Sequence, residues 1–321
     1  MERPQELAKD IVLIDGLSGS GKSLLCPVLS TMERGELWLA DHVFEYLSAM
    51  ESFGRISRDA AGVLVRLFAD FDLYNLFISR YTNFRETDQT GARLNLLHKR
   101  QIKRLKMQDG NVVMERIRNE KPVLLLMTHY ILDESDVLFD ALGDRLKLYI
   151  VTVRHPAHLV EFWHNACWPD RVGVQPREFQ LSARWKGKIV PWYAVRWADQ
   201  YLALKSPLEK SVWAVTYFFR RFEQKVAFMP ARRKEKVLFI PFEEFSTDPE
   251  KHLSRVAKRT GMRVGPLARK MMKKLKLPRE NPKESIEAQK KKIRQWMEDD
   301  KAPSRTRVML EELINRYEEK Y

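Results

Sequence analysis

The sequence predicts an α/β protein with a three-layer, mostly parallel and doubly wound sheet. Short aliphatic runs alternate along the chain with longer segments that carry apolar residues at helical spacing, which is the pattern of parallel βαβ units. A glycine-rich turn joins the first of these runs to a helical segment. The 321 residues, 44% of them hydrophobic and 31% charged, are enough to bury a core of this size.

Each expected strand is a short apolar run bounded by polar residues, as buried parallel strands are. The five runs span residues 11–14, 37–40, 122–128, 146–153 and 237–240. Helical periodicity between and beside them predicts helices over residues 23–30, 57–80, 93–107 and 250–260. Gly261 is expected to close the last of these helices in a left-handed conformation.

Two changes of composition divide the chain. We assign residues 1–265 to the α/β domain and residues 266–321 to a basic, charged helical tail. Six of the eight tryptophans fall in an insertion at about 161–230. We expect this insertion to be mostly helical, to cover one end of the sheet and to use its tryptophans mainly as core.

The formal net charge of +14 favours phosphate-bearing partners and anionic membrane surfaces. We therefore expect a nucleotide partner and peripheral contact of the basic C-terminal region with an anionic membrane, whereas nucleic acid is not an expected partner. The two cysteines, Cys26 and Cys167, form neither a disulfide framework nor a metal-binding pair with histidine. No apolar run reaches the roughly 20 residues of a membrane span, so a cytoplasmic location is expected.

The segment from Gly16 to Ser23 is G-L-S-G-S-G-K-S and matches the phosphate-loop pattern G-x-x-x-x-G-K-[ST] in full. It follows an expected buried strand and precedes an expected helix, as this pattern requires. Backbone amides of such a loop and the start of the helix surround an anion, and the lysine neutralises a terminal phosphate. The residues expected to bind the nucleotide are Gly16, Ser18, Gly19, Ser20, Gly21, Lys22 and Ser23, with Lys22 also placed in catalysis.

Three later segments resemble the sulfotransferase family. They are P-V-L-L-L-M-T-H-Y at residues 122–130, K-L-Y-I-V-T-V-R-H-P at 147–156 and V-L-F-I-P-F-E-E-F-S-T-D-P-E at 237–250. In that family one strand ends in Lys-Thr-His, the next ends in Arg-Asn-Pro, and a late strand ends in an acidic turn followed by Asp-Pro. The order and spacing hold over roughly residues 11–261. The resemblance implies the three-layer P-loop fold that sulfotransferases share with nucleoside triphosphate hydrolases.

The resemblance also implies an activity, namely transfer of a sulfuryl group from phosphoadenosine phosphosulfate to a hydroxyl acceptor, such as a glycan or a lipid-linked sugar. His129 falls on the catalytic histidine of the family, and Arg154 falls on the arginine that contacts the phosphate on the donor's ribose. A neutral histidine suits proton abstraction, and a guanidinium suits a phosphate. The sequence departs from the family at the loop, at Met127 in place of lysine and at Phe162 in place of serine.

A kinase that uses ATP and Mg²⁺ is the alternative, because the loop resembles that of adenylylsulfate kinases. Asp41 would then act as a base or organise the metal, and the Ser23 hydroxyl would bind Mg²⁺. The structural interpretation of Asp41 is a helix N-cap. A second alternative is a nucleotide-binding adaptor without enzymatic activity, whose basic tail docks on another surface.

The remaining candidate site residues also have structural interpretations. Arg80, Asn83 and Arg85 lie in a polar loop after the expected helix 57–80, which we assign to the acceptor side. His129 could instead be a satisfied histidine at the edge of the core. Arg154 could be an ion-pair partner of the glutamates in the late acidic turn, which we expect to brace the helix that follows them.

Overall fold

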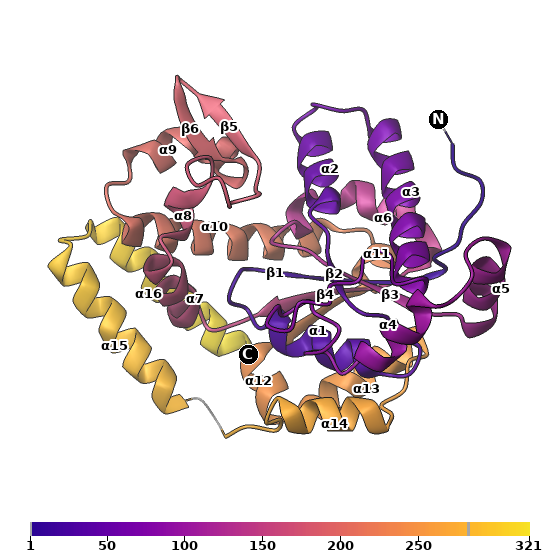
Figure 1. Ribbon diagram of the computed structural model, residues 1–321. Helices are drawn as coiled ribbons and strands as arrows, with labels where there is room; N and C mark the ends of the chain where they lie inside the picture. Colours follow the sequence, from indigo (N-terminus) through magenta and orange to yellow (C-terminus); the bar gives the residue numbers. More distant parts are fainter. Residues whose placement is uncertain (1, 281–282) are drawn as a thin grey trace.

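The computed structural model describes residues 2–280 and 283–321, and at its centre is a five-stranded parallel sheet (Figure 1). The strand order is β2-β3-β1-β4-β7, and each neighbouring pair is parallel. The predicted parallel, doubly wound α/β class is therefore confirmed. The strands are β1 (Asp10–Gly16), β2 (Leu39–Ala40), β3 (Val123–Met127), β4 (Leu146–Val153) and β7 (Val237–Pro241).

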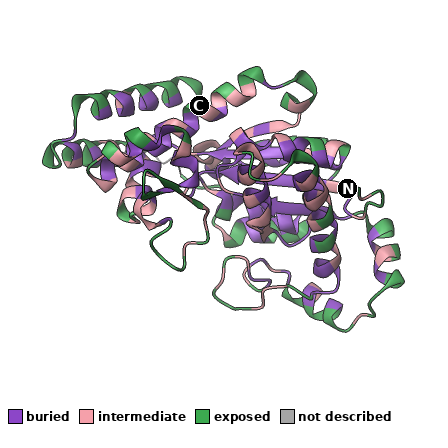
Figure 2. Cartoon of the chain, turned by 90° about the horizontal axis from the view of Figure 1, so that it is seen from above, coloured by how far each residue is buried: buried purple, intermediate pink, exposed green. Residues whose placement is uncertain are grey.

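The central strand β1 pairs with β3 on one side and β4 on the other. Val12 lies opposite Leu125 in β3 and Leu148 in β4, and all three are fully buried. Helices cover both faces of the sheet, and β1, β3 and β4 are almost entirely buried (Figure 2). Their sequences are accordingly almost continuously apolar. After β1 the chain builds β2 and β3 on one side and then crosses to β4 and β7 on the other. The ends of β1, β3 and β4 consequently meet at one edge, where α/β sheets bind ligands.

Helices pack on the two faces of this sheet. In Figure 1, α2, α3 and α6 lie above the sheet, and α1, α13 and α14 lie below it. The bounds of these helices are α1 (Lys22–Thr31), α2 (Val43–Ser52), α3 (Arg58–Phe77), α6 (Asp136–Leu142), α13 (Pro249–Thr260) and α14 (Pro266–Lys274). Gly261 ends α13 with a φ of 70°, the left-handed conformation that the sequence predicts for this position.

The insertion 161–230 contains helices and also a strand pair that the expectation of a mostly helical segment did not include. The pair is the antiparallel hairpin of β5 (Ser182–Trp185) and β6 (Lys188–Pro191). The helices of this region are α7 (Pro156–Asn165), α8 (Trp168–Arg171), α9 (Ala198–Ala203) and α10 (Pro207–Phe228). Trp163, Trp192 and Trp197 are buried, as their assignment to the core predicts.

The C-terminal helices α15 (Lys283–Asp299) and α16 (Ser304–Lys320) form the tail that the sequence predicts as helical. α15 packs along α7, and α16 packs against α10 and α7 (Figure 1). Within the described ranges, no helix is long and apolar enough to cross a membrane. The remaining helices are α4 (His98–Leu105), α5 (Asn111–Glu120), α11 (Ala231–Lys234) and α12 (Phe242–Thr247), with 3₁₀ turns at Leu132–Glu134, Gly143–Arg145 and Trp192–Trp197.

Two expected elements are shorter in the structure, and side-chain hydrogen bonds explain both. The helix expected over 93–107 begins only at His98, because the Asn95 amide donates to the carbonyls of Gln89 and Gly91 and holds that backbone in turns. The strand expected over 37–40 is reduced to its last two residues. The backbone N–H of Trp38 donates to Ser30 Oγ at 3.0 Å instead of to a neighbouring strand.

Candidate functional site

A cavity of about 520 Å³ opens at the edge where β1, β3 and β4 end, and its volume is typical of small-molecule sites. Five residues of the phosphate-loop segment form one wall, namely Ser18, Gly19, Gly21, Lys22 and Ser23, and His129 follows β3 into the cavity. Gly16 and Ser20, which the sequence also assigns to nucleotide binding, are not among the described lining residues. Arg154 follows β4, and Arg279 approaches from the segment after α14. The described lining residues thus include the cations Lys22, Arg154 and Arg279 and no carboxylate.

The loop has the backbone geometry of a phosphate cradle. Gly16 and Gly21 have φ values of 135° and 103°, which L side chains rarely adopt. A Cβ atom on Gly21 would also lie 2.5 Å from Cδ2 of Phe242, so only glycine fits there. Ser18 Oγ is buried and has no hydrogen-bond partner among the described residues. The loop therefore combines a buried, unpartnered hydroxyl with the amino end of α1 beside the cavity.

Lys22 at the start of α1 is held by its own loop. Its Nζ donates to the carbonyl oxygens of Gly16 and of Leu17, the latter at 3.0 Å. Burial lowers the pKa of Lys22 to about 8, although the carboxylate of Asp15 opposes the shift. A phosphate would offer the ammonium a stronger partner than these carbonyls.

Asp15, next to the loop in β1, ties the loop to the turn that carries the candidate base. It is fully buried and accepts hydrogen bonds from the backbone N–H groups of Ile131 at 3.0 Å and Leu132 at 2.9 Å. It also accepts from the hydroxyls of Thr128 and Tyr149. Burial raises the pKa of Asp15, and Lys22 with these donors counteracts the shift. Sequence reasoning did not single out this carboxylate.

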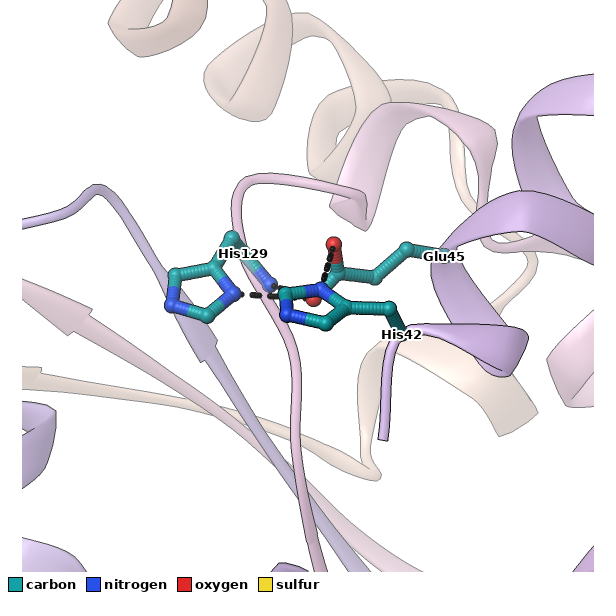
Figure 3. Close-up of side chains that lie close together, drawn as sticks. All are labelled: His42, Glu45 and His129. Atoms are coloured by element: carbon teal, nitrogen blue, oxygen red, sulfur yellow. Dashed lines mark hydrogen bonds and ion pairs between the residues drawn. The ribbon is translucent and has the colours of Figure 1, made fainter. Parts of the chain in front are cut away.

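His129 does not stand alone at the end of β3. Glu45 Oε1, from α2, lies 2.8 Å from His129 Nδ1 and accepts the backbone N–H of His129 at 3.0 Å. The second oxygen of Glu45 lies 3.0 Å from Nδ1 of His42, whose ring stacks on the His129 ring with centroids 5.7 Å apart. Figure 3 shows the carboxylate reaching both rings while Nε2 of His129 points away from it.

The charges in this cluster favour an ionised glutamate. Burial opposes ionisation of Glu45, yet His129 and His42 hold its pKa at about 2. The hydrogen bond to Glu45 also raises the pKa of His42. One ligand atom from each of the three residues lies within 4.8 Å of the others, a spacing compatible with a metal ion. The hydrogen bonds already give each Nδ1 a partner, so the same cluster orients an imidazole base without a metal.

Two arginines, Arg154 and Arg279, also line the cavity. The guanidinium of Arg154 stacks on the Phe242 ring at 3.7 Å and donates to the carbonyl of Gly19 at 3.2 Å. No ion pair of Arg154 with a carboxylate is present among the described residues, although the charge of Glu243 still favours the guanidinium. Burial lowers the pKa of Arg154 to about 10, Glu243 opposes the shift, and the nearby charge of Arg279 adds to it.

The glutamates of the late acidic turn have structural partners. Glu243 accepts hydrogen bonds from the backbone N–H of His155 at 3.0 Å and from the hydroxyl of Tyr317 at 2.6 Å. Glu244 pairs with Lys251 in α13. The expectation that these glutamates brace their surroundings is therefore met, although Glu243 braces α7 and α16 instead of the helix that follows it.

The structure places the other predicted residues outside the nucleotide cavity. Asp41 Oδ1 accepts the backbone N–H of Val43 at 2.9 Å, which is the capping role, and Asp41 lines a second, smaller cavity together with Asn83. Arg80 and Arg85 are not among the described residues that line either cavity. They pair instead with the aspartates Asp109 and Asp88.

Comparisons with known proteins give a distant likeness only. No protein-family model and no curated protein matches the sequence. Among solved structures, a sulfotransferase domain from the curacin biosynthetic pathway is 15% identical, with a TM-score of 0.41 over 82% of this chain and 77% of that one. A sulfotransferase domain from the Synechococcus PCC 7002 olefin synthase is 12% identical, with a TM-score of 0.37 over 84% and 78%. The sequence resemblance is thus accompanied by a remote similarity to sulfotransferase domains.

Proposed function

We propose that this protein transfers a sulfuryl group from phosphoadenosine phosphosulfate to a hydroxyl acceptor. The observation that carries the proposal is the placement of His129. Its Nδ1 is engaged by an ionised Glu45, and its Nε2 has no hydrogen-bond partner among the described residues, while His129 lines the same cavity as the phosphate loop. A base of this kind beside an anion cradle suits abstraction of a proton from an attacking hydroxyl.

The cavity supports a donor with two separate anionic groups. The loop and Lys22 form one anion site, and the unpaired guanidinium of Arg154 with Arg279 forms the other. Phosphoadenosine phosphosulfate carries a phosphosulfate on its 5′ carbon and a phosphate on its 3′ carbon, which matches two sites. Bringing two guanidiniums together is costly unless an anion joins them, so the arginine pair favours a nucleotide with a ribose phosphate.

Each side chain then has a role in the transfer. As the acceptor oxygen forms its bond to sulfur, His129 Nε2 takes the hydroxyl proton and Glu45 stabilises the resulting imidazolium. The bond between sulfur and the bridging phosphate oxygen breaks. The negative charge left on that oxygen is met by the loop amides and the Lys22 ammonium, which is already at the loop.

A small-molecule kinase is the second candidate, and the complete loop with Ser23 at its end favours it. In that reaction Ser23 would bind Mg²⁺ and the ammonium of Lys22 would meet the phosphates of ATP. Asp41, which the kinase would use as its base, lies in the second cavity and caps α2. The position of this carboxylate therefore favours the sulfuryl-transfer proposal over the kinase.

Thermal stabilisation by a nucleotide panel, followed by turnover, tests the proposal. We expect phosphoadenosine phosphate to stabilise the protein without Mg²⁺ and more strongly than ADP does. We also expect turnover of phosphoadenosine phosphosulfate that depends on His129. Stabilisation by ATP only in the presence of Mg²⁺ would replace the proposal with the kinase. Tight nucleotide binding without turnover on a broad acceptor panel would favour the third interpretation, a nucleotide-binding adaptor without enzymatic activity.

A further inference from the structure

A second cavity, of about 260 Å³, adjoins the nucleotide cavity. It lies between the residues that flank β2, the middle of α3 and the loop 81–90. Trp38 lines both cavities, and the consecutive residues Gln89 and Thr90 line one each. Trp38 is therefore a wall that the two cavities share, and a molecule in the second cavity would lie beside the nucleotide cavity.

This cavity is acidic although the whole chain carries a formal charge of +14. Among its described lining residues, the charged side chains are Asp41 and Asp72. Asp72 is 7% exposed, and its Oδ2 has no hydrogen-bond partner within the described chain. Asp70, two residues earlier on α3, is also buried but accepts from Arg145 and from two backbone amides. Asp70 therefore has several partners, whereas one carboxyl oxygen of Asp72 has none among the described residues.

The two carboxyl groups of the second cavity interact with each other. Burial, the charge of Asp41 and a hydrogen bond with Asp41 raise the pKa of Asp72 to about 8. At neutral pH Asp72 consequently keeps its proton in the free protein. A ligand that brings a positive charge and several donors would let both groups ionise, and a primary ammonium brings one charge and three donors.

We propose that this cavity binds the amino group of the acceptor, so that the acceptor is a hydroxylated primary amine of the amino-sugar class. The inference rests on the proposed sulfuryl transfer and names its substrate class. The rest of the cavity suits such a molecule. Thr90 Oγ1 accepts from the Asn83 amide at 2.8 Å and keeps its proton for a ligand hydroxyl, while Trp38 and Leu76 offer apolar walls to a sugar ring.

Equilibrium binding tests the inference without reference to turnover. The probes are ethanolamine, glucosamine and kanamycin, each compared with its N-acetylated form by calorimetry at pH 7. We expect at least one free amine to bind ten or more times tighter than its neutral N-acetyl counterpart. Binding should release about one proton, measured in buffers of different ionisation enthalpy, because Asp72 loses its proton when the ammonium arrives.

Variants connect the binding to the cavity. Asp72→Asn is close in shape to the protonated carboxyl and should weaken binding of the amine at least tenfold. Asp144→Asn is the matched control, because it removes an exposed carboxylate that pairs with Arg232 on the surface. It should bind the amine as the wild type does. Circular dichroism of each variant confirms that it is folded.

Three results would overturn the inference. The first is equal affinity for the amines and their N-acetyl forms, and the second is unchanged amine binding by Asp72→Asn. The third is binding of Mg²⁺ or Ca²⁺ that requires Asp72 while no amine binds, which would make the cavity a cation site. Failure of the proposed function has a different signature. If phosphoadenosine phosphate does not bind while amine binding still depends on Asp72, the assignment of the sulfuryl donor is wrong. The second cavity would still be a site for primary amines.

Discussion

The Oε1 atom of Glu45 lies 2.8 Å from Nδ1 of His129 and also accepts the backbone N–H of the same residue at 3.0 Å. One carboxylate therefore holds both the ring and the main chain of the histidine. A carboxylate on Nδ1 favours the proton on that nitrogen, which leaves the lone pair on Nε2, the nitrogen that points away from Glu45. The two residues come from α2 and from the end of β3, so the packing of α2 on the sheet sets the direction of the base.

Glu45→Gln should lower kcat about tenfold or more and change KM for the donor little. The amide is neutral, so the imidazolium that forms when His129 takes a proton loses its adjacent negative charge. Steady-state kinetics measure both constants. Glu51→Gln on the same helix is the control, because Glu51 pairs with Arg58 away from the cavity. Equal loss of kcat in both variants would show a general effect on α2 and contradict the positioning role.

His129→Ala should remove turnover, by a factor of about 10²–10⁴, while leaving nucleotide affinity nearly intact. The side chain supplies the base at Nε2, whereas the loop and the arginines supply the donor contacts. Turnover of phosphoadenosine phosphosulfate and calorimetric binding of phosphoadenosine phosphate separate these two effects. His98→Ala, at an exposed position on α4, should leave both unchanged. A normal kcat in the His129 variant would exclude the base role.

The sequence predicts those site residues that belong to a continuous motif or directly follow an expected strand. The segment Gly16–Ser23 is continuous in the chain, so its pattern alone indicates a phosphate cradle. His129 and Arg154 follow two expected strands, and the ends of parallel strands meet at one edge of a sheet. Glu45 lies on α2, 84 residues before its partner His129 in the chain. No local pattern indicates which side chain of α2 will point toward the end of β3.

Arg279 and Asp72 were missed for the same reason, because their importance arises from packing between distant segments. The hairpin of β5 and β6 is a different case, since a local signal was present. Lys186 and Gly187 both have positive φ, at 45° and 80°, and a two-residue turn of this kind joins antiparallel strands. The expectation of helices rested on the tryptophans of this region alone.

Lys22→Met should lower the affinity for phosphoadenosine phosphate at least tenfold and remove a pH dependence that the wild type shows. Burial lowers the pKa of Lys22 from 10.5 to about 8, and an anion in the loop favours the charged form. Nucleotide binding in the wild type should therefore weaken as the pH rises above about 8. Calorimetry from pH 7 to 9.5 measures the slope, and the variant should have none in this range. Nucleotide affinity equal to that of the wild type would refute the loop assignment.

Arg279→Ala should lower the affinity for phosphoadenosine phosphate about tenfold while changing the affinity for ADP little. The guanidinium lies near Arg154, and a ribose 3′-phosphate is the group that would join the two charges. Competition binding with the two nucleotides gives the ratio. Arg269→Ala, an exposed arginine that pairs with Glu250, is the control and should leave the ratio unchanged. Equal losses for both nucleotides would assign Arg279 a general electrostatic role instead of 3′-phosphate recognition.

Asp72→Asn should make the protein more stable at alkaline pH and flatten the pH dependence of its stability. Burial and Asp41 raise the folded-state pKa of Asp72 from 3.8 to about 8. Between these two values the unfolded chain has released the proton while the folded chain keeps it, so the wild type loses stability as the pH rises from about 4 to about 8. Asparagine cannot ionise, which removes this contribution.

Urea unfolding at pH 5, 7 and 9 measures the effect. The free energy of unfolding of the variant should rise relative to that of the wild type with increasing pH, by an amount on the order of 1–3 kcal/mol. Asp144→Asn should show the same pH dependence of stability as the wild type. Asp144 is exposed, so removing its charge does not remove a buried ionisable group. If the free energy of unfolding changed with pH equally in Asp72→Asn and the wild type, burial would not disfavour ionisation of Asp72. The second cavity would then have no unmet negative charge for a cation to neutralise.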